Sequence, residues 1–167
     1  GMIANYQYLP DNELEQIKGL SNQEDDLLDF AEDSADTHDI LLDIDKMWDA
    51  LHFVLTGASS SEPIKNNPFS EAVVGVSSIE GVEEFISYTE KGRIKDIVFA
   101  LDHFDIEKAM ENFSMKECKQ ANIYPDIWNY EEETDEIKEE LMDYFQNLKD
   151  FYKKILEVNG NVMVTIC

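Results

Sequence analysis

The pattern of apolar residues near the C-terminal end of the sequence limits the possible folds more than any other feature. From Thr134 onward, apolar side chains recur at steps of three and four residues, the spacing of one broad helical face. The residues of this stripe are Ile137, Leu141, Tyr144, Phe145, Leu148, Phe151, Tyr152 and Ile155. Asn159-Gly160 ends the helix, and Val162 to Cys167 has the composition of a strand. A long helix that passes directly into a strand favours an α/β arrangement in which helices pack on a sheet.

The rest of the sequence predicts a single domain over residues 1–167, because neither a Pro/Gly/Ser-rich linker nor a repeat interrupts it. Ile3 to Leu9 is apolar and aromatic without charge, which predicts a first strand. The segment Val82 to Tyr88 fits either a short helix or a strand. Helices are expected to outnumber strands, so the fold class is α/β or α+β and helix-rich.

Capping signals mark several expected helix starts. A Ser followed three residues later by Glu can satisfy free amide groups at a helix start, and a lone Asp or Thr can cap in the same way. Such signals occur at Ser21–Glu24, Thr89, Asp105 and Ser114–Glu117, and Pro68 suits the first turn of a short helix that ends before Gly75. We therefore expect helices to begin near residues 22, 68, 90, 106 and 115.

The charge of the chain excludes several classes of partner. Thirteen Lys and Arg stand against 37 Asp and Glu, which gives a formal net charge of −24 at pH 7. Affinity for nucleic acid depends on clustered basic residues, so unaided nucleic-acid binding is not expected. Docking on an anionic membrane is disfavoured for the same reason, and no uncharged stretch approaches the ~20 residues of a membrane span. Two cysteines form no disulfide framework, and a reducing cytoplasm is the expected location.

The segment Asp43 to Gly57 carries the most unusual side-chain chemistry in the sequence. Its apolar residues recur with helical spacing, so we expect a helix over residues 43–56 that stops at Gly57. On such a helix Asp45, Asp49 and His52 stand at positions i, i+4 and i+7 and share one face. An Asp–His pair on one face could set a tautomer for general-base catalysis.

The same segment, DIDKMWDALHFVLTG, resembles the central motif of the YfbM-like family, a bacterial family of unknown function. The resemblance continues through MIANYQ near the start, NPFSEAVVG, NIYPDIW and the terminal NGNVMVTI, and so spans nearly the whole chain. The residues that match the family pattern are Asp45, Lys46, Trp48, His52, Thr56, Gly57, Asn67, Pro68, Tyr124, Pro125 and Trp128. The resemblance implies a layered α/β fold with a small mixed sheet in a cytoplasmic protein, and it implies no activity.

Residues of these motifs form the candidate binding cleft, which we expect to be lined by tryptophan and histidine. Its members are Asp45, Trp48, Asp49, His52, Thr56, Asn67, Tyr124 and Trp128. The alternative is structural, with Trp48 buried and His52 hydrogen-bonded at the edge of the core. No Gly-rich phosphate loop, EF-hand loop or zinc-spaced histidine pair occurs, so we expect neither a cofactor nor a metal.

Two acidic runs add a second functional possibility. Residues 24–49 contain eleven carboxylates and one base, and residues 126–143 contain nine carboxylates and one base. A solvated face is the usual explanation of such runs, whereas complementary charge would speed the docking of a basic partner. The leading hypothesis is therefore a non-enzymatic cytoplasmic binding protein with an acidic surface and the cleft. The alternatives are an inhibitor or immunity-type protein for a basic protein, and a small hydrolase that uses Asp45, Asp49 and His52.

Overall fold

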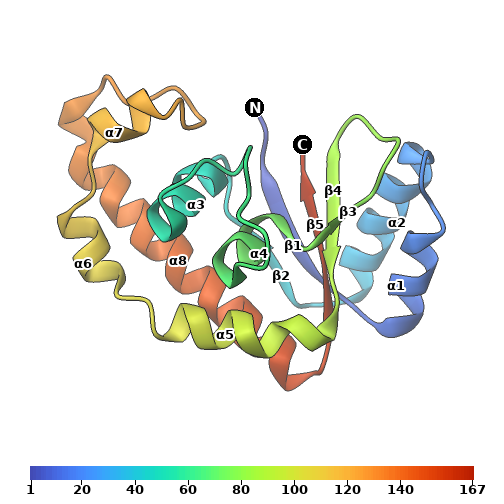
Figure 1. Cartoon of the computed structure of the whole chain (residues 1–167). Coiled ribbons are helices and arrows are strands. Elements are labelled where there is room, and N and C mark those ends of the chain that lie inside the picture. The colour runs from blue at the N-terminus through green and yellow to red at the C-terminus, as the bar shows by residue number, and fades with distance from the viewer.

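The computed structural model describes all residues from 1 to 167 and shows a sheet between two layers of helices (Figure 1). The strands are β1 (Ala4–Leu9), β2 (Leu41–Asp43), β3 (Ser77–Ser78), β4 (Phe85–Thr89) and β5 (Asn161–Ile166). The α-helices are α1 (Asp11–Lys18), α2 (Glu24–Thr37), α3 (Trp48–Thr56), α4 (Pro68–Val74), α5 (Ile94–Asp102), α6 (Ile106–Glu111), α7 (Met115–Gln120) and α8 (Thr134–Glu157). Two 3-10 turns, Lys91–Arg93 and Glu131–Glu133, precede α5 and α8. The predicted helix-rich α/β fold is confirmed, and none of the helices is long and apolar enough to cross a membrane.

The strand order is β2-β1-β5-β4-β3, and every neighbouring pair is antiparallel. The sheet is therefore antiparallel throughout. The mixed sheet that the family resemblance implies is wrong. β1 and β4 do run in the same direction, but β5 lies between them and opposes both. α8 leads into β5, which separates β1 from β4, so no parallel pair forms.

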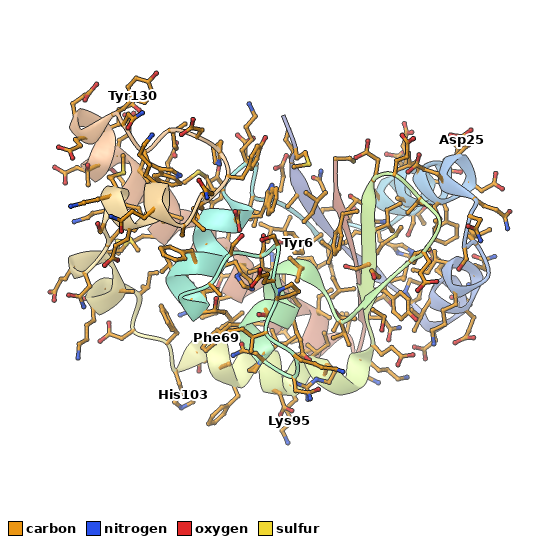
Figure 2. The ribbon with its side chains drawn as sticks, turned by 45° about the horizontal axis from the view of Figure 1, so that its top comes forward. Tyr6, Asp25, Phe69, Lys95, His103 and Tyr130 are labelled. Atoms are coloured by element: carbon orange, nitrogen blue, oxygen red, sulfur yellow. The ribbon has the colours of Figure 1, made fainter.

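The two faces of the sheet are covered unequally. One face packs against α3 to α8 in a core of 29 buried residues, to which β1 contributes Ala4 and Tyr6. The other face packs against α1 and α2 in a smaller core of eight buried residues that includes Leu9 and Met163. Figure 2 shows Tyr6 inside the molecule and Asp25 on the outer side of α2. The thin second layer leaves part of its sheet face uncovered.

The C-terminal stripe forms the longest helix of the large core, as its spacing predicts. Seven of its eight residues are buried in α8, and Tyr144 is half-buried at the edge. Asp135 and Glu136 occupy the first turn and Lys154 the last, which is the charge order that the helix dipole favours. The apolar spacing alone was sufficient here because the partner of the helix is a broad hydrophobic face.

The end of α4 is held by hydroxyl groups from three other elements. The carbonyls of residues 72, 73 and 74 accept hydrogen bonds of 2.6 Å from the hydroxyls of Tyr152, Tyr6 and Ser87, in that order. These hydroxyls come from α8, β1 and β4. Burial raises the pKa of both tyrosines, so the phenols remain protonated donors. A short helix whose last carbonyls face the core thereby has these groups satisfied.

Local capping signals were confirmed at two sites and wrong at two others. Asp105 accepts the amide of Lys108 at 3.1 Å, and Ser114 caps α7 in the same manner. Ser21 caps nothing, because α2 begins at Glu24 and the Glu24 carboxylate accepts the backbone amide of Glu84 at 2.8 Å. Thr89 ends β4, the strand that resolves the ambiguous segment 82–88, and its hydroxyl is buried without a partner.

Candidate binding cavity beside Trp48 and Tyr124

The helix expected over residues 43–56 is shorter than predicted. Residues 41–43 form β2, and Asp45 adopts a left-handed backbone conformation with φ of 52°. Its amide donates to the Asp43 carboxylate at 2.7 Å, which closes a local turn. α3 begins only at Trp48, so the expectation that Asp45 shares one helical face with Asp49 and His52 is wrong. Asp45 lies exposed on the turn before the helix.

Asp49 is a buried carboxylate, 4% exposed, that holds two distant loops against α3. Its Oδ1 accepts the backbone amide and the hydroxyl of Ser60, both at 2.7 Å, and the hydroxyl of Ser59 at 3.2 Å. Its Oδ2 accepts the backbone amide of Tyr124 at 2.9 Å. Hydrogen bonds to a carboxylate are stronger than neutral ones, so this side chain fixes the loops at residues 58–62 and 122–125 together.

Two aromatic rings stack beside this carboxylate. The ring centroids of Trp48 and Tyr124 lie 5.3 Å apart with an interplanar angle of 26°. The indole Nε1 of Trp48 donates to the Met2 carbonyl at 3.0 Å, and the Met2 amide donates to the Tyr124 hydroxyl at 2.8 Å. The polar tips of both rings are thus satisfied by one backbone segment, and the rings form a rigid wall.

The stack, the Asp49 loops and the end of the sheet border a partly open cavity of about 380 Å³. Its lining residues are Met2, Trp48, Asp49, Ser59, Ser60, Ser61, Val74, Phe85, Asn122, Tyr124 and Ile166. Most of the wall is apolar or aromatic, and the polar groups gather on the serine loop. The hydroxyls of Ser59 and Ser61 lie 3.0 Å apart there. We refer to this space as the Trp48 cavity.

His52 lies behind the Trp48 cavity and does not line it. It is completely buried, and its Nδ1 donates to the Ala58 carbonyl at 2.7 Å because a carbonyl oxygen can only accept. Its Nε2 then accepts the Ser70 hydroxyl at 2.8 Å. Burial lowers the pKa of His52, against the opposing effects of the Ala58 carbonyl and the Asp49 charge. The neutral ring therefore joins α3, the following loop and α4 as a structural group.

Thr56, Asn67 and Trp128 do not line the cavity and make hydrogen bonds elsewhere. The Thr56 hydroxyl donates to the His52 carbonyl one turn earlier in α3 at 2.8 Å. Asn67 caps the start of α4 by accepting the amide of Phe69 at 2.8 Å. Trp128 is buried, and its indole donates to the Ile123 carbonyl at 2.7 Å beside the loop that carries Tyr124.

Of the eight predicted residues, the structure brings Trp48, Asp49 and Tyr124 together around one cavity. The remaining five lie elsewhere, and His52 bonds to no carboxylate, so the residues of the hydrolase alternative are not assembled. Sequence reasoning did not identify the serine loop, because three consecutive serines carry no periodic signal. Met2, Phe85 and Ile166 were missed because only the sheet brings the two chain ends and β4 to this place.

A family model with the description "Domain of unknown function (DUF1877)" matches residues 1–165 of the chain. The chain belongs to the DUF1877 family. This DUF1877 chain is 32% identical over 172 residues to Protein YfbM of Escherichia coli (strain K12), a match that covers 99% of this chain and 98% of that protein. The crystal structure of YfbM from Escherichia coli, a protein of unknown function, is similar, with a TM-score of 0.82 and 27% identity over 99% of both chains.

These similarities confirm the resemblance to a YfbM-like family and the layered α/β fold. They carry no activity over to the DUF1877 chain, because the family and the relative are themselves of unknown function. No three of its His, Cys, Asp and Glu side chains converge as ligands for a metal ion. The Trp48 cavity is therefore described by its own chemistry, which is a mostly apolar hollow with a few hydroxyl and amide groups.

Proposed function

We propose that this DUF1877 chain is a non-enzymatic binding protein of the cytoplasm and that its binding site is the Trp48 cavity. The observation that carries the proposal is the Asp49 carboxylate, which accepts groups from both loops and so builds the cavity in advance of any ligand. Preformed apolar hollows with a few fixed polar groups are the usual form of small-molecule sites. A preformed wall also lowers the entropic cost of binding.

The size and lining of the cavity restrict the ligand class. A cavity of about 380 Å³ is at the small end of ligand sites, which span roughly 300–1,000 Å³, so it suits a molecule with a single ring. The stacked rings of Trp48 and Tyr124 favour a flat apolar body, and the hydroxyls of Ser59 and Ser61 suit one polar substituent. The net charge of −24 disfavours an anionic ligand.

Three probes with the same ring and different charge test this proposal. Tyramine is cationic, 4-methylphenol is neutral and 4-hydroxyphenylacetate is anionic, and each is titrated while amide NMR shifts are followed. We expect shifts at Ser60 and Tyr124, and weaker binding of the anion than of the other two. Tyr124→Ala should abolish the shifts, because it removes half of the aromatic wall.

The matched control is Phe99→Ala, which removes an aromatic side chain that is 64% exposed on α5 and does not line the cavity. This variant should bind like the original chain. The proposal fails if none of the probes shifts amides around the cavity, or if Tyr124→Ala and Phe99→Ala bind the probes equally well.

A second candidate function is docking of a basic protein. It is favoured by α2, which carries seven Asp and Glu among fourteen residues and no basic residue. Neutralising Asp25, Asp29 and Glu32 together should slow association with poly-L-lysine more than the matched neutralisation of three exposed α8 carboxylates. The α8 residues for this control are Glu136, Glu139 and Asp143. Equal effects of the two triple variants would mean that the general charge, and not α2, attracts the partner.

A further inference from the structure

The strand β2 forms an open edge of the sheet, since it pairs only with β1. Backbone hydrogen bonds of 3.1 Å join Ile40 and Ile44 to β1. In an antiparallel pair the bonded residues alternate, so Leu42 also faces β1 while Leu41 and Asp43 turn their backbone groups away from it. The N–H and C=O groups of Leu41 and Asp43 therefore point to the side of β2 on which the sheet has no further strand. The edge therefore presents four free backbone groups in the pattern that an added strand requires.

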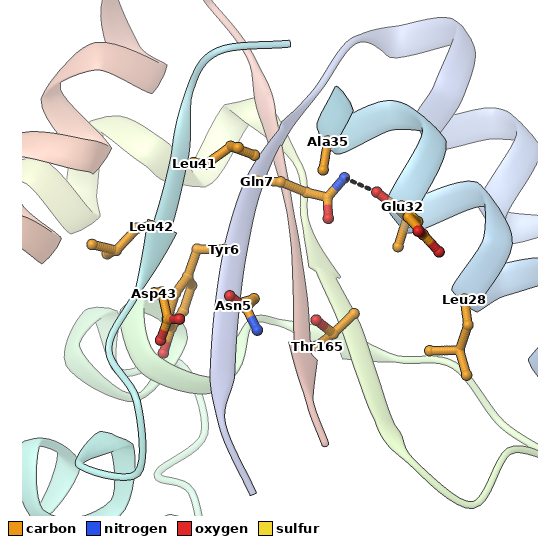
Figure 3. Close-up of a pocket in the computed structure, with 11 residues that line it drawn as sticks. Asn5, Tyr6, Gln7, Leu28, Glu32, Ala35, Leu41, Leu42, Asp43 and Thr165 are labelled. Carbon is orange, nitrogen blue, oxygen red and sulfur yellow. Dashed lines mark hydrogen bonds between the residues drawn. The ribbon is translucent and has the colours of Figure 1, made fainter. Parts of the chain in front are cut away.

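A cavity lies on each face of this edge. On the α2 side, a space of about 410 Å³ lies between α2 and the uncovered part of the sheet (Figure 3). Figure 3 shows Gln7 bridging from β1 to α2, where its amide donates to the Ala31 carbonyl at 3.0 Å. On the α8 side, a second space of about 240 Å³ lies between β2 and α8. Leu41 and Leu42 line both, so an added strand could direct its alternate side chains into two separate cavities.

The charges around the edge favour a basic occupant. Glu32 and Asp43 line the cavity on the α2 side, and Asp39 and Asp150 line the cavity on the α8 side. Lys154 is the one base in either lining. A second copy of this chain would bring its own acidic β2 against these carboxylates, and like charges on facing strands are destabilising. The occupant that the charges complement is an extended segment rich in Lys or Arg.

We propose that β2 is a docking edge for an extended basic segment of a partner protein, which pairs with the free backbone groups of Leu41 and Asp43. Neighbouring Lys or Arg side chains of this segment point to opposite faces, so they enter the two flanking cavities and meet their carboxylates. Backbone pairing supplies affinity and the two cavities supply specificity, as in other strand-addition complexes. The proposal rests on the basic-partner function and is independent of the Trp48 cavity.

The probe is a seven-residue peptide with Lys at its three central positions and Val at the other four, acetylated and amidated at its ends, so that neighbouring lysines point to opposite faces of the added strand. On binding, we expect slower amide hydrogen exchange at Leu41 and Asp43. Leu41→Pro removes one outward N–H without touching the bonds to β1, and Leu41→Ala removes the side chain while keeping that N–H. Leu41→Pro should bind about fivefold more weakly than Leu41→Ala, the effect of one lost backbone hydrogen bond.

Two modified peptides keep the test independent of how the variants fold. One peptide is N-methylated at the backbone nitrogens that face β2, and it should not bind. The other is N-methylated at the intervening nitrogens, which point away from β2, and it should bind like the parent peptide. Equal binding of Leu41→Pro and Leu41→Ala, equal effects of the two methylated peptides, or no binding of the parent peptide would each overturn the proposal. Binding that protects only α2 amides would overturn it too, while keeping the broader basic-partner function.

Discussion

Replacing Asp49 with Asn tests whether one carboxylate builds the Trp48 cavity. The original side chain has two acceptor oxygens, of which one serves Ser60 and the other serves the Tyr124 amide. Asparagine has one oxygen and one NH₂ group of nearly the same shape. If the oxygen keeps the contacts with Ser60, the NH₂ group faces the N–H of Tyr124, and two donors then meet.

The magnitude follows from these contacts. A hydrogen bond to a charged group contributes about 1.5–3 kcal/mol, and an unpaired amide at Tyr124 costs about 1–3 kcal/mol more. Relief of a buried charge offsets part of this loss, since Asp49 is only 4% exposed. We therefore expect Asp49→Asn to lower the free energy of unfolding by roughly 2–4 kcal/mol, and the Tm by roughly 5–15 °C.

Urea unfolding followed by circular dichroism measures the change, and Asp126→Asn is the matched control. Asp126 is exposed in the same loop as Tyr124 and makes no side-chain hydrogen bond, so its replacement should change stability by less than about 0.5 kcal/mol. Amide exchange at Ser60 and Tyr124 should also accelerate in Asp49→Asn. A variant as stable as Asp126→Asn, with both loop amides still protected, would refute the assignment of Asp49 as the group that holds the loops.

Three further predictions concern protons, thiols and salt. Because burial lowers the pKa of His52 below its unfolded value near 6.5, the unfolded state binds more protons there, so stability should fall as pH is lowered through about 6.5. His52→Asn should flatten this part of the stability profile, and equal slopes in both proteins would contradict the buried neutral ring. Burial raises the pKa of the Cys118 thiol to about 12, so iodoacetamide at pH 8 should modify exposed Cys167 first and Cys118 only on unfolding, as mass spectrometry would show. With a net charge of −24, the Tm should rise by about a few degrees as NaCl goes from about 0.01 to 0.15 M, and a flat or falling Tm would show that the fold compensates its carboxylates.

The elements that the sequence predicted well are those whose signal is local. The α8 stripe, the Pro68 helix start and the Asp105 cap each depend on residues within a few turns of each other. The predictions that failed concern places where contacts between distant parts of the chain determine the local structure. Ser21 does not cap α2, because the helix begins only at Glu24 and the Glu24 carboxylate accepts the backbone amide of Glu84. The helix expected at residues 43–56 lost its first turn because residues 41–43 pair with β1 as a strand.

The sequence predicted some of the side chains at the candidate site, but it did not predict the full set of residues that line the cavity. Trp48, Asp49 and Tyr124 were identified from motifs, and the structure places them around one cavity. The partners of Asp49 lie 10 to 75 residues away in sequence, a separation over which no spacing rule operates. Spacing predicted His52 as a cleft residue, but spacing does not indicate how deeply a side chain is buried. His52 is completely buried and acts as a structural group.

The hydroxyl groups at the end of α4 also determine when that helix can exist. Tyr6, Ser87 and Tyr152 lie 67, 13 and 80 residues from the carbonyls they bond, and a seven-residue helix has little stability of its own. The last turn of α4 therefore becomes stable only after β1, β4 and α8 have assembled around it. Since β1 and α8 come from opposite ends of the chain, we expect the amides of α4 to exchange with solvent only when these distant segments separate.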